Sequence, residues 1–306
     1  MSLALLCAGQ GRQQPGMFDI FEGEKAADPI FDAAAVLLGQ DPRRFVAEAS
    51  KDELHANRAS QLLCVTSALA AAACLAPART IVAGYSVGEM AAWGAAGVWD
   101  AETTLHLTAR RAELMDQADS GGGLGFIRGL DRQDVEALAA EFRCSIAIIN
   151  PDRLFIIGGD STDIAACCNE ALSRGATNAR PIDVHVASHT QRLANAVAPF
   201  EQTLRTFAAA SPRFGYKLLS ASSGNLIGTP VTALSNLANQ LATPIDWAAT
   251  LDALIERGTD QVLEIGPGDA LSAMVRSAHP SVAARTLGDF RSIEGADRWM
   301  RTTDRG

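Results

Sequence analysis

The feature that most restricts the fold is a glycine-flanked serine between an apolar run and an alanine-rich segment. Residues 80–83 (TIVA) predict a buried strand, residues 84–88 (GYSVG) a tight turn, and residues 88–96 a helix. A strand, a tight turn and a helix in this order are typical of a nucleophile elbow, where bulky neighbours would clash and glycines expose the serine hydroxyl. A serine before a helix is also a common N-cap. The motif alone therefore leaves both a catalytic and a structural role open for Ser86.

The segments around this turn alternate between short apolar runs and alanine-rich helical patterns. This alternation predicts an α/β domain with a mainly parallel sheet. Strands are expected at residues 3–8, 80–83, 216–222 and 261–265, and helices at residues 30–38, 59–75, 88–96, 101–117 and 192–210.

A different order of elements follows the glycine-rich stretch at residues 120–123. It predicts strand 124–128, helix 132–142, strands 144–149 and 154–158, helix 163–174 and strand 179–186. The order β-α-β-β-α-β is typical of a ferredoxin-like α+β module. We therefore predict a hydrolase-like large α/β domain at residues 1–121 and 191–306 and an inserted ferredoxin-like small domain at residues 122–190. Residues 301–306 are expected to form a loose tail.

Composition excludes several functional classes. A hydrophobic content of 48% in 306 residues indicates a globular chain, and the formal net charge of −9 argues against nucleic-acid binding through phosphate contacts. No apolar window reaches the roughly 18 to 20 residues of a membrane helix, residues 68–77 coming nearest, and the first residues lack a basic leader. The six cysteines and five histidines lack the spacing of metal ligands. We expect a soluble cytoplasmic protein with reduced cysteines, no metal and no membrane partner.

A serine nucleophile needs a base. Among the five histidines, His189 ends the expected strand where the chain returns to the large domain, so it could overhang a cleft between the two domains. His185 lies four residues earlier on the same face of that strand and could be a packing residue. Position alone makes His189 the best candidate.

Several short motifs occur in order along the chain. They are GQG at residues 9–11 with Gln13 and residues 16–17 (GM), GYSVGE at residues 84–89, RAELM at residues 111–115, NP at residues 150–151, SH at residues 188–189, PIDW at residues 244–247 and EIGPG at residues 264–268. Together they resemble the motifs of malonyl-CoA:acyl carrier protein transacylases and polyketide acyltransferase domains. The six-residue motif, for example, resembles Gly-His-Ser-x-Gly-Glu of that family.

The resemblance implies catalytic roles for two residues. Ser86 would attack a thioester carbonyl, and His189 would take its proton and later activate the acceptor thiol. A backbone carbonyl can orient such a histidine, so no acidic third member is required. Gln10 and the amide of Val87 would form the oxyanion hole. The amide is the first after the nucleophile at a helix N-terminus, where the helix dipole also favours negative charge.

The resemblance also implies the acyl group and its binding residues. Arg111 would pair with the free carboxylate of a malonyl group, a role that suits a planar, two-pronged cation. Tyr85, Ser188 and Asn150 are expected to line the pocket. Malonyl-CoA would be the donor and an acyl carrier protein the acceptor, with no tightly bound cofactor.

Some positions depart from the family pattern. Tyr85 replaces a histidine, residues 7–8 (CA) replace Phe-Pro, and Arg12 replaces a serine. Residues 186–188 (VAS) fit neither the malonyl nor the methylmalonyl pattern of modular polyketide acyltransferases, so an α-methyl group on the substrate stays open.

Several functions remain open. The GYSVGE variant resembles the malonyl transferase subunit of bacterial malonate decarboxylase, whose acceptor would be a carrier subunit of that enzyme; fatty-acid or polyketide synthesis is the alternative. A serine thioesterase or esterase would need an acid, and the nearest candidate, Asp183, lies only six residues before His189. A third hypothesis is a non-catalytic carrier-binding subunit. The cations available for CoA phosphates are Arg12, Arg58, Arg110, Arg192 and Lys217.

Overall fold

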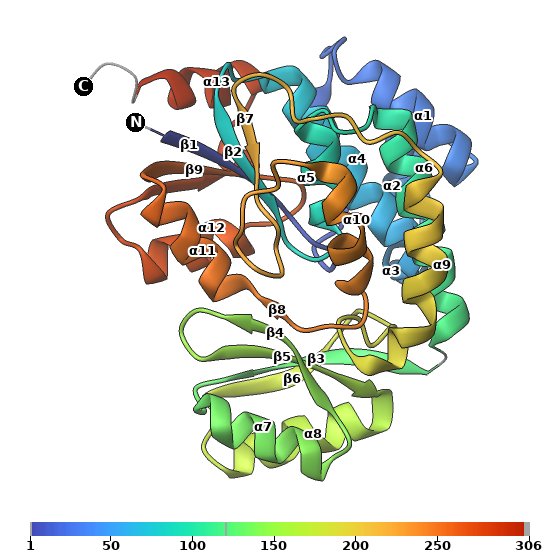
Figure 1. The fold of residues 1–306 in the computed structure, drawn as a ribbon, viewed down its shortest axis with the longest axis vertical. Helices are drawn as coiled ribbons and strands as arrows, with labels where there is room; N and C mark the ends of the chain where they lie inside the picture. Colours follow the sequence, from blue (N-terminus) through green and yellow to red (C-terminus); the bar gives the residue numbers. More distant parts are fainter. Residues whose placement is uncertain (1, 120, 303–306) are drawn as a thin grey trace.

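A parallel five-stranded sheet forms the centre of the large domain in the computed structural model, which describes residues 2–119 and 121–302. The strand order is β10-β9-β1-β2-β7, and every pair is parallel. The strands are β1 (Ser2–Cys7), β2 (Thr80–Gly84), β7 (Tyr216–Leu218), β9 (Thr259–Ile265) and β10 (Ala283–Thr286). Helices cover both faces of this sheet, as apolar parallel strands require (Figure 1).

The two faces of the sheet pack into two separate apolar clusters. Leu5 and Val82 pack on the side of the N-terminal helices, while Leu6 and Ala83 pack with Trp247 on the opposite side. The helices are α1 (Asp28–Leu38), α2 (Pro42–Glu48), α3 (Lys51–His55), α4 (Asn57–Leu75), α5 (Gly88–Ala95), α6 (Ala101–Ala118), α9 (Ala194–Arg205), α10 (Pro230–Asn239), α11 (Trp247–Glu256), α12 (Ala270–Ala278) and α13 (Ile293–Thr302). Short 3-10 turns lie at η1 (Asp19–Phe21), η2 (Gln191–Leu193) and η3 (Leu287–Asp289).

Helix α4 corrects the expectation that no apolar segment is long enough to cross a membrane. By length and composition the helix would suffice, but 78% of the apolar window is buried inside the protein. It contributes Leu62, Leu63 and Val65 to the main core cluster. Its apolar character is that of a central core helix, which is hydrophobic on all sides because it is packed on all sides.

A second sheet has the order β6-β3-β5-β4-β8. Its strands are β3 (Gly122–Arg128), β4 (Ser145–Asn150), β5 (Leu154–Asp160), β6 (Asn178–Ile182) and β8 (Ile245–Asp246), with helices α7 (Arg132–Glu141) and α8 (Ser161–Ser173) on its outer face (Figure 1). The first four strands pair antiparallel in the ferredoxin-like order. The predicted fold class, a mainly parallel α/β domain with an inserted ferredoxin-like module, is confirmed; the exact domain boundaries stay a prediction.

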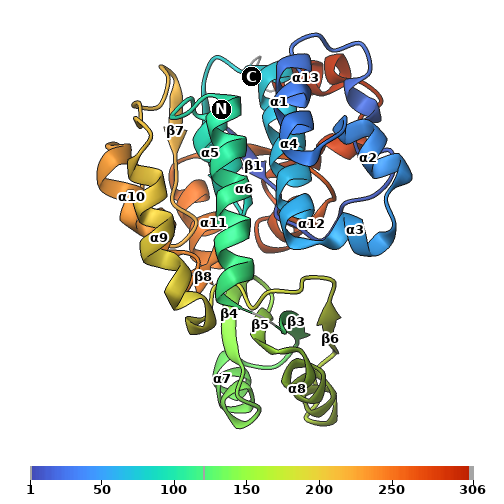
Figure 2. The ribbon, with the colours of Figure 1, turned by 90° about the vertical axis from the view of Figure 1, so that its right-hand side faces the viewer.

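Strand β8 comes from the C-terminal half of the chain and pairs parallel with β4. It therefore ties the second sheet to the large domain at a point far in sequence from the insertion. Figure 2 shows α6 running along the large domain and ending beside the small one.

Three elements differ from the prediction by four or more residues at one end. Strand β6 ends at Ile182 rather than at residue 186, because the chain leaves the sheet there to return to the large domain. His185 and His189 therefore lie in an irregular segment, not in a strand. Strand β7 ends at Leu218, before a turn closed by the bond from the amide of Ser220 to the carbonyl of Asn225. The expected helix 192–210 is a 3-10 turn followed by the shorter α9. The expected tail at residues 301–306 lies mostly outside the described residues.

Candidate active site

Close backbone contacts explain why two glycines flank Ser86. Ser86 itself has φ = 54°, in the left-handed region, at the turn between β2 and α5. A Cβ on Gly84 would lie 2.0 Å from the carbonyl oxygen of Gly88, and one on Gly88 would lie 2.1 Å from the carbonyl oxygen of Cys7. No other residue fits either position without moving backbone, so the strand and helix can meet this tightly only with glycine at both places.

The structure brings Ser86 and His189 together from segments 103 residues apart. The distance from Ser86 Oγ to His189 Nε2 is 2.8 Å, and His189 Nδ1 lies 2.6 Å from the backbone oxygen of Gln240. Because a carbonyl oxygen only accepts, Nδ1 carries the proton and Nε2 is the acceptor for the serine hydroxyl. The backbone amide of His189 also donates to Leu241 at 2.8 Å, and His189 has φ = 63°. The ring is thus fixed in the tautomer of a general base.

The surroundings of His189 keep its ring neutral. Burial and, to a smaller extent, the nearby positive charge of Arg111 together lower its pKa to about 3, although the hydrogen bond to the Gln240 carbonyl acts in the opposite direction. The imidazole is therefore unprotonated at neutral pH and available to accept a proton from Ser86.

Asp183, the candidate acid of a hydrolase triad, has a different partner, although it lines the same cleft as Gln10 and Tyr85. Its carboxylate pairs with Lys51 at 2.8 Å on the surface, and His189 Nδ1 is already bonded to the Gln240 backbone. The arrangement is a serine–histidine pair oriented by a backbone carbonyl, which does not favour the Ser-His-Asp hydrolase hypothesis.

Arg111 is a buried cation, 1% exposed, on the inner face of α6. Its Nη1 donates to Gln61 at 2.6 Å and contacts the Met115 sulfur at 3.2 Å, and its Nη2 donates to the Gln240 side chain at 3.4 Å. Within the described residues, no carboxylate lies at ion-pair distance from this guanidinium. Burial lowers its pKa to about 10, so it stays charged at neutral pH. A buried charge held only by neutral groups suits a carboxylate supplied by a ligand.

Gln240, which was not among the site residues predicted from the sequence, contacts three of the buried polar residues of the site. Its backbone oxygen accepts from His189, its side-chain oxygen accepts from Arg111, and its side-chain amide donates to Glu89. Glu89 is 1% exposed and also accepts from the amide of Ala221 at 3.3 Å. Burial raises the pKa of Glu89 to about 7, against the opposing effect of these donors and of Arg111. Gln240 is outside every motif, so its only signal is the fold itself.

The two residues expected to form the oxyanion hole come from different segments of the large domain. Gln10 follows β1, and its buried Nε2 has no hydrogen-bond partner among the described residues. Val87 is fully buried, follows Ser86 directly and occupies the N-cap position of α5. An unpaired buried donor such as Gln10 Nε2 and a backbone amide at a helix N-terminus are both of the kind that can bind a developing oxyanion.

The three expected pocket residues occupy different environments. Tyr85 packs edge-on against Trp247 with ring centroids 5.3 Å apart, and burial raises its pKa. Asn150 is 3% exposed at the end of β4. Ser188 is buried next to His189, and its amide donates to the carbonyl of Val186.

A cleft of about 470 Å³ runs from Gln10 and Tyr85 to the small-domain sheet. The face of that sheet opposite α7 and α8 lines it. Two rows of paired residues cross this face: Ile156, Phe126 and Arg180 in one, and Leu154, Arg128 and Asn178 in the other. The Arg180 guanidinium lies 5.4 Å from the Phe126 ring centroid. The cleft therefore joins an apolar wall to two cations that sequence analysis did not single out.

The cations named from the sequence are distributed differently. Arg12 lines this cleft and lies 3.4 Å from Asp269. The other four lie elsewhere: Arg58 and Arg110 beside Glu113, Arg192 beside Asp119, and Lys217 on β7. Within residues 2–119 and 121–302, no group of three histidine, cysteine or acidic side chains could hold a metal ion.

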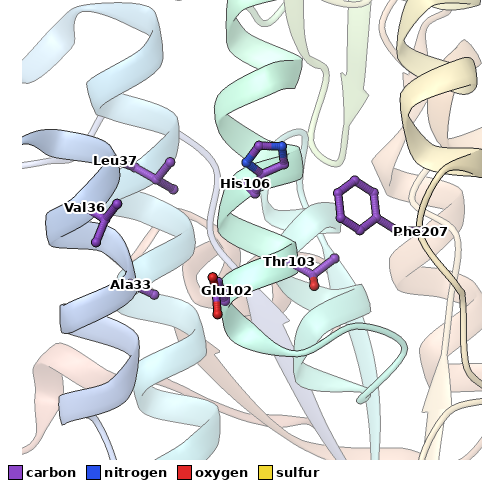
Figure 3. Close-up of a pocket in the computed structure, with 7 residues that line it drawn as sticks. All are labelled: Ala33, Val36, Leu37, Glu102, Thr103, His106 and Phe207. Carbon is purple, nitrogen blue, oxygen red and sulfur yellow. The ribbon is translucent and has the colours of Figure 1, made fainter.

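A separate hollow of about 320 Å³ lies between α1 and α6. Figure 3 shows His106 there, between Leu37 and Phe207, and the His106 and Phe207 rings are 5.7 Å apart. None of its lining residues borders the cleft that Gln10 and Tyr85 line, so His106 belongs to a surface contact between helices and loop.

Comparison with known proteins decides the family. The model of the acyl transferase domain matches residues 5–296. The chain belongs to the acyl transferase domain family. This confirms the family resemblance derived from the ordered motifs.

Individual relatives of this acyl transferase agree with that placement. The polyketide synthase GfsB of Streptomyces halstedii is 30% identical over 217 residues, which are 70% of this chain and 4% of that protein. The malonyl CoA-acyl carrier protein transacylase of Staphylococcus aureus (strain MSSA476) is 26% identical over 303 residues, covering 95% of this chain and 97% of that one. The chain thus spans a small part of the synthase and nearly all of the transacylase.

Solved structures give the same fold. The acyl-carrier-protein S-malonyltransferase of Burkholderia pseudomallei 1710b matches with a TM-score of 0.89 at 27% identity, covering 97% of this chain and 100% of that one. A malonyl-transacylase solved in complex with a type II polyketide synthase acyl carrier protein matches with a TM-score of 0.90 at 24% identity, covering 97% and 99%.

Proposed function

We propose that this protein is a malonyl-CoA:acyl carrier protein S-malonyltransferase that works through an ester on Ser86. The observation that carries the proposal is the 2.8 Å contact between Ser86 Oγ and His189 Nε2 in one hydrogen-bonded network with the buried Arg111. The names of the full-length transacylase relative and of the Burkholderia structure support the same activity.

In the first half-reaction, Ser86 Oγ attacks the thioester carbon while its proton passes to His189 Nε2. Gln10 and the Val87 amide stabilise the oxyanion that forms. The carbon–sulfur bond then breaks, and CoA leaves as the thiol with the proton from His189. In the second half-reaction the carrier thiol gives its proton to His189 and attacks the ester, and Ser86 regains its proton as the carbon–oxygen bond breaks.

Arg111 selects the acyl group. The malonyl carboxylate would complete the hydrogen bonds of a guanidinium that otherwise has two glutamine oxygens and a thioether. A neutral acyl group would leave this buried cation without a charged partner, so the pocket favours malonyl over acetyl.

The cleft provides a path for the pantetheine arm that donor and acceptor share. Apolar residues of the small-domain sheet, such as Phe126 and Ile156, would contact the arm, and Arg128 and Arg180 at the same face would bind phosphate. The protein carries a formal charge of −9, so an anionic ligand needs such local cations.

The acceptor is an acyl carrier protein. The relatives reported above are a carrier-protein transacylase and a polyketide synthase, which supports a carrier of fatty-acid or polyketide synthesis. Transfer to a carrier subunit of malonate decarboxylase stays a prediction, as do the absence of a tightly bound cofactor and a cytoplasmic location.

The test is the intact mass of the protein after brief incubation with malonyl-CoA, acetyl-CoA or methylmalonyl-CoA. We expect a malonyl adduct on the wild type and none on Ser86→Ala. Methylmalonyl-CoA shows whether the pocket accepts an α-methyl group. An adduct retained by Ser86→Ala, or no adduct with any donor, would overturn the proposal. Hydrolysis of the adduct by water faster than its transfer to a carrier thiol would favour a thioesterase.

A further inference from the structure

The segment that carries His189 is the return crossing from the small domain to the large one. It has little regular structure between the end of β6 at Ile182 and the start of the 3-10 turn at Gln191. His189 itself has φ = 63°, a conformation that a non-glycine residue keeps only when its surroundings hold it there. We therefore expect contacts with surrounding residues to hold the backbone in place both before and after His189.

Asp119, at the end of α6, contacts both sides of that turn. Its Oδ2 accepts from the amide of Ala187 at 2.8 Å, two residues before His189. Its Oδ1 accepts from Arg192 Nε at 2.9 Å and Nη2 at 2.6 Å, three residues after His189. The two carboxylate oxygens thus bind the two ends of a six-residue segment, 187–192.

The local backbone is shaped to accept this carboxylate. The Asp119 side chain is 1% exposed. A Cβ on Gly122, the first residue of β3, would lie 1.9 Å from Asp119 Oδ2, so only glycine permits the approach. Asp119 lies where the chain leaves α6 for the small domain, and Ala187 and Arg192 lie where the chain returns to the large domain. The Asp119 carboxylate therefore links the two connections between the domains.

We propose that Asp119 is a positioning residue that holds the His189 turn in register with Ser86. The proposal rests on the proposed function of His189 as the base. It assigns to Asp119 no contact with substrate. Asp119 acts through the backbone of Ala187 and through Arg192, while Gln240 and Leu241 hold the histidine from the other side.

A carboxylate is needed because both of its oxygens accept. An asparagine has one oxygen, so Asp119→Asn loses either the bond to the Ala187 amide or the pair of bonds to Arg192, where its amide would face another donor. Movement of a catalytic group by about 1 Å can lower a rate on the order of a hundredfold. We therefore expect Asp119→Asn to slow acylation of Ser86 by at least about tenfold.

The experiment measures single-turnover acylation by malonyl-CoA as a function of its concentration, which separates the maximal rate constant from the half-saturating concentration. For Asp119→Asn we expect the rate constant to fall and the half-saturating concentration to change by less than about twofold, because the acyl and CoA contacts are untouched. The matched control is Asp131→Asn, which breaks an exposed aspartate–arginine pair of the small domain with Arg153 and should leave both values unchanged. Wild-type rates in Asp119→Asn would overturn the proposal.

Arg192→Lys provides a second test if Asp119→Asn folds poorly. The side chain at this position is 37% exposed, so lysine is tolerated, and its single ammonium cannot donate through both Nε and Nη2 positions. We expect a rate constant lowered about fivefold with an unchanged thermal midpoint. A rate equal to that of the wild type would contradict the proposal.

Hydrogen exchange tests the contacts of Asp119 with Ala187 and Arg192 without reference to activity. The Ala187 amide should be protected in the wild type and exchange at least about tenfold faster in Asp119→Asn, while amides of α4 stay unchanged. Unchanged exchange at residues 186–192 would overturn the proposal. If the wild type forms no malonyl ester but the two proteins still show this difference in exchange, the proposed function is refuted while the structural role of Asp119 is supported.

Discussion

Glu89 and Arg111 are joined through one side chain, the amide of Gln240, which donates to the Glu89 carboxylate and accepts from the Arg111 guanidinium. The backbone oxygen of the same Gln240 holds His189. The group proposed to recognise the malonyl carboxylate, the proposed base and a buried acid therefore share one residue. Removal of the positive charge at Arg111 should therefore change the pKa of both Glu89 and His189.

Replacing Arg111 by alanine should change acyl selectivity. We expect kcat/KM for malonyl-CoA to fall on the order of a hundredfold, about 3 kcal/mol, with a much smaller loss for acetyl-CoA. The control is Arg110→Ala, which removes an adjacent arginine paired with Glu113 at the surface. Equal losses for both donors would exclude the carboxylate role.

The pH dependence of acylation should reflect the neutral state of His189. Since burial and the charge of Arg111 lower its pKa to about 3, the rate should not fall from His189 protonation between pH 8 and pH 5. The profile is best measured in Glu89→Gln, which removes the other buried titrating group. In Arg111→Ala with acetyl-CoA, loss of the cation should raise the pKa of His189 and move the acid limb to higher pH. A limb near pH 6.5 in the parent would contradict the effect of burial.

Glu89 should lower stability as pH rises. Burial raises its pKa from about 4.5 to about 7, so between these values the unfolded chain releases the proton that the folded chain retains. The penalty is absent below pH 4.5, grows up to pH 7 and is constant above, and it reaches at most about 3 kcal/mol. Denaturant unfolding of the wild type and Glu89→Gln at pH 5 and pH 7.5 measures it: the stability difference should shift in favour of the variant at the higher pH. Parallel pH dependence in the two proteins would refute the raised pKa.

Gln10 offers a direct test of the oxyanion hole. Its buried Nε2 lacks a partner among the described residues, so Gln10→Ala removes a donor without breaking a protein contact of that atom. We expect the acylation rate constant to fall on the order of a hundredfold with little change in thermal stability. Gln14→Ala, at an exposed position of the same loop, is the control. A loss of only a few-fold would assign the oxyanion to other donors.

Binding of the CoA phosphates can be separated from the thioester reaction by comparing a donor with phosphates and a donor without them. Arg128→Gln and Arg180→Gln should each raise KM for malonyl-CoA severalfold and leave the reaction with malonyl-pantetheine, which carries no phosphate, unchanged. Arg132→Gln, on the outer helix α7 and paired with Glu136, is the matched control. Equal effects on both donors would mean that these arginines act on the shape of the cleft.

Local signals were sufficient for the fold class, for four strands of the parallel sheet and for the small domain, whereas β8, β10, α2, α3 and α10 to α13 were not predicted. The strand–turn–helix around Ser86 and the β-α-β-β-α-β order were predictable because periodicity and glycine positions are properties of neighbouring residues. The end of β6 was not predictable. The residues after Ile182 remain apolar enough to continue a strand, but the chain leaves β3 there, although β3 itself extends to Gly122. The apolar length of α4 was underestimated, since scattered polar residues such as Gln61 and Thr66 are buried in the structure.

The residues of the candidate site also fall into those that sequence motifs identify and those that only the fold brings together. Ser86, His189, Gln10 and Arg111 stand in motifs, and the fold brings Ser86 and His189 into contact and links Arg111 to the same network. Gln240 and Asp119 act through contacts more than 50 residues away in sequence and stand in no motif. Arg128 and Arg180 became candidates only when strand register placed them on one face.

The short strand β8 limits how this enzyme can be taken apart. Because Ile245 and Asp246 complete the small-domain sheet beside β4, residues 122–190 expressed alone would expose the backbone of β4 as an open edge, a site for self-association. A chimaera that exchanges the small domain between related transferases would pair a new β4 with the resident β8. Such an exchange should succeed best when residues 245–246 and the facing residues 148–149 are transplanted together.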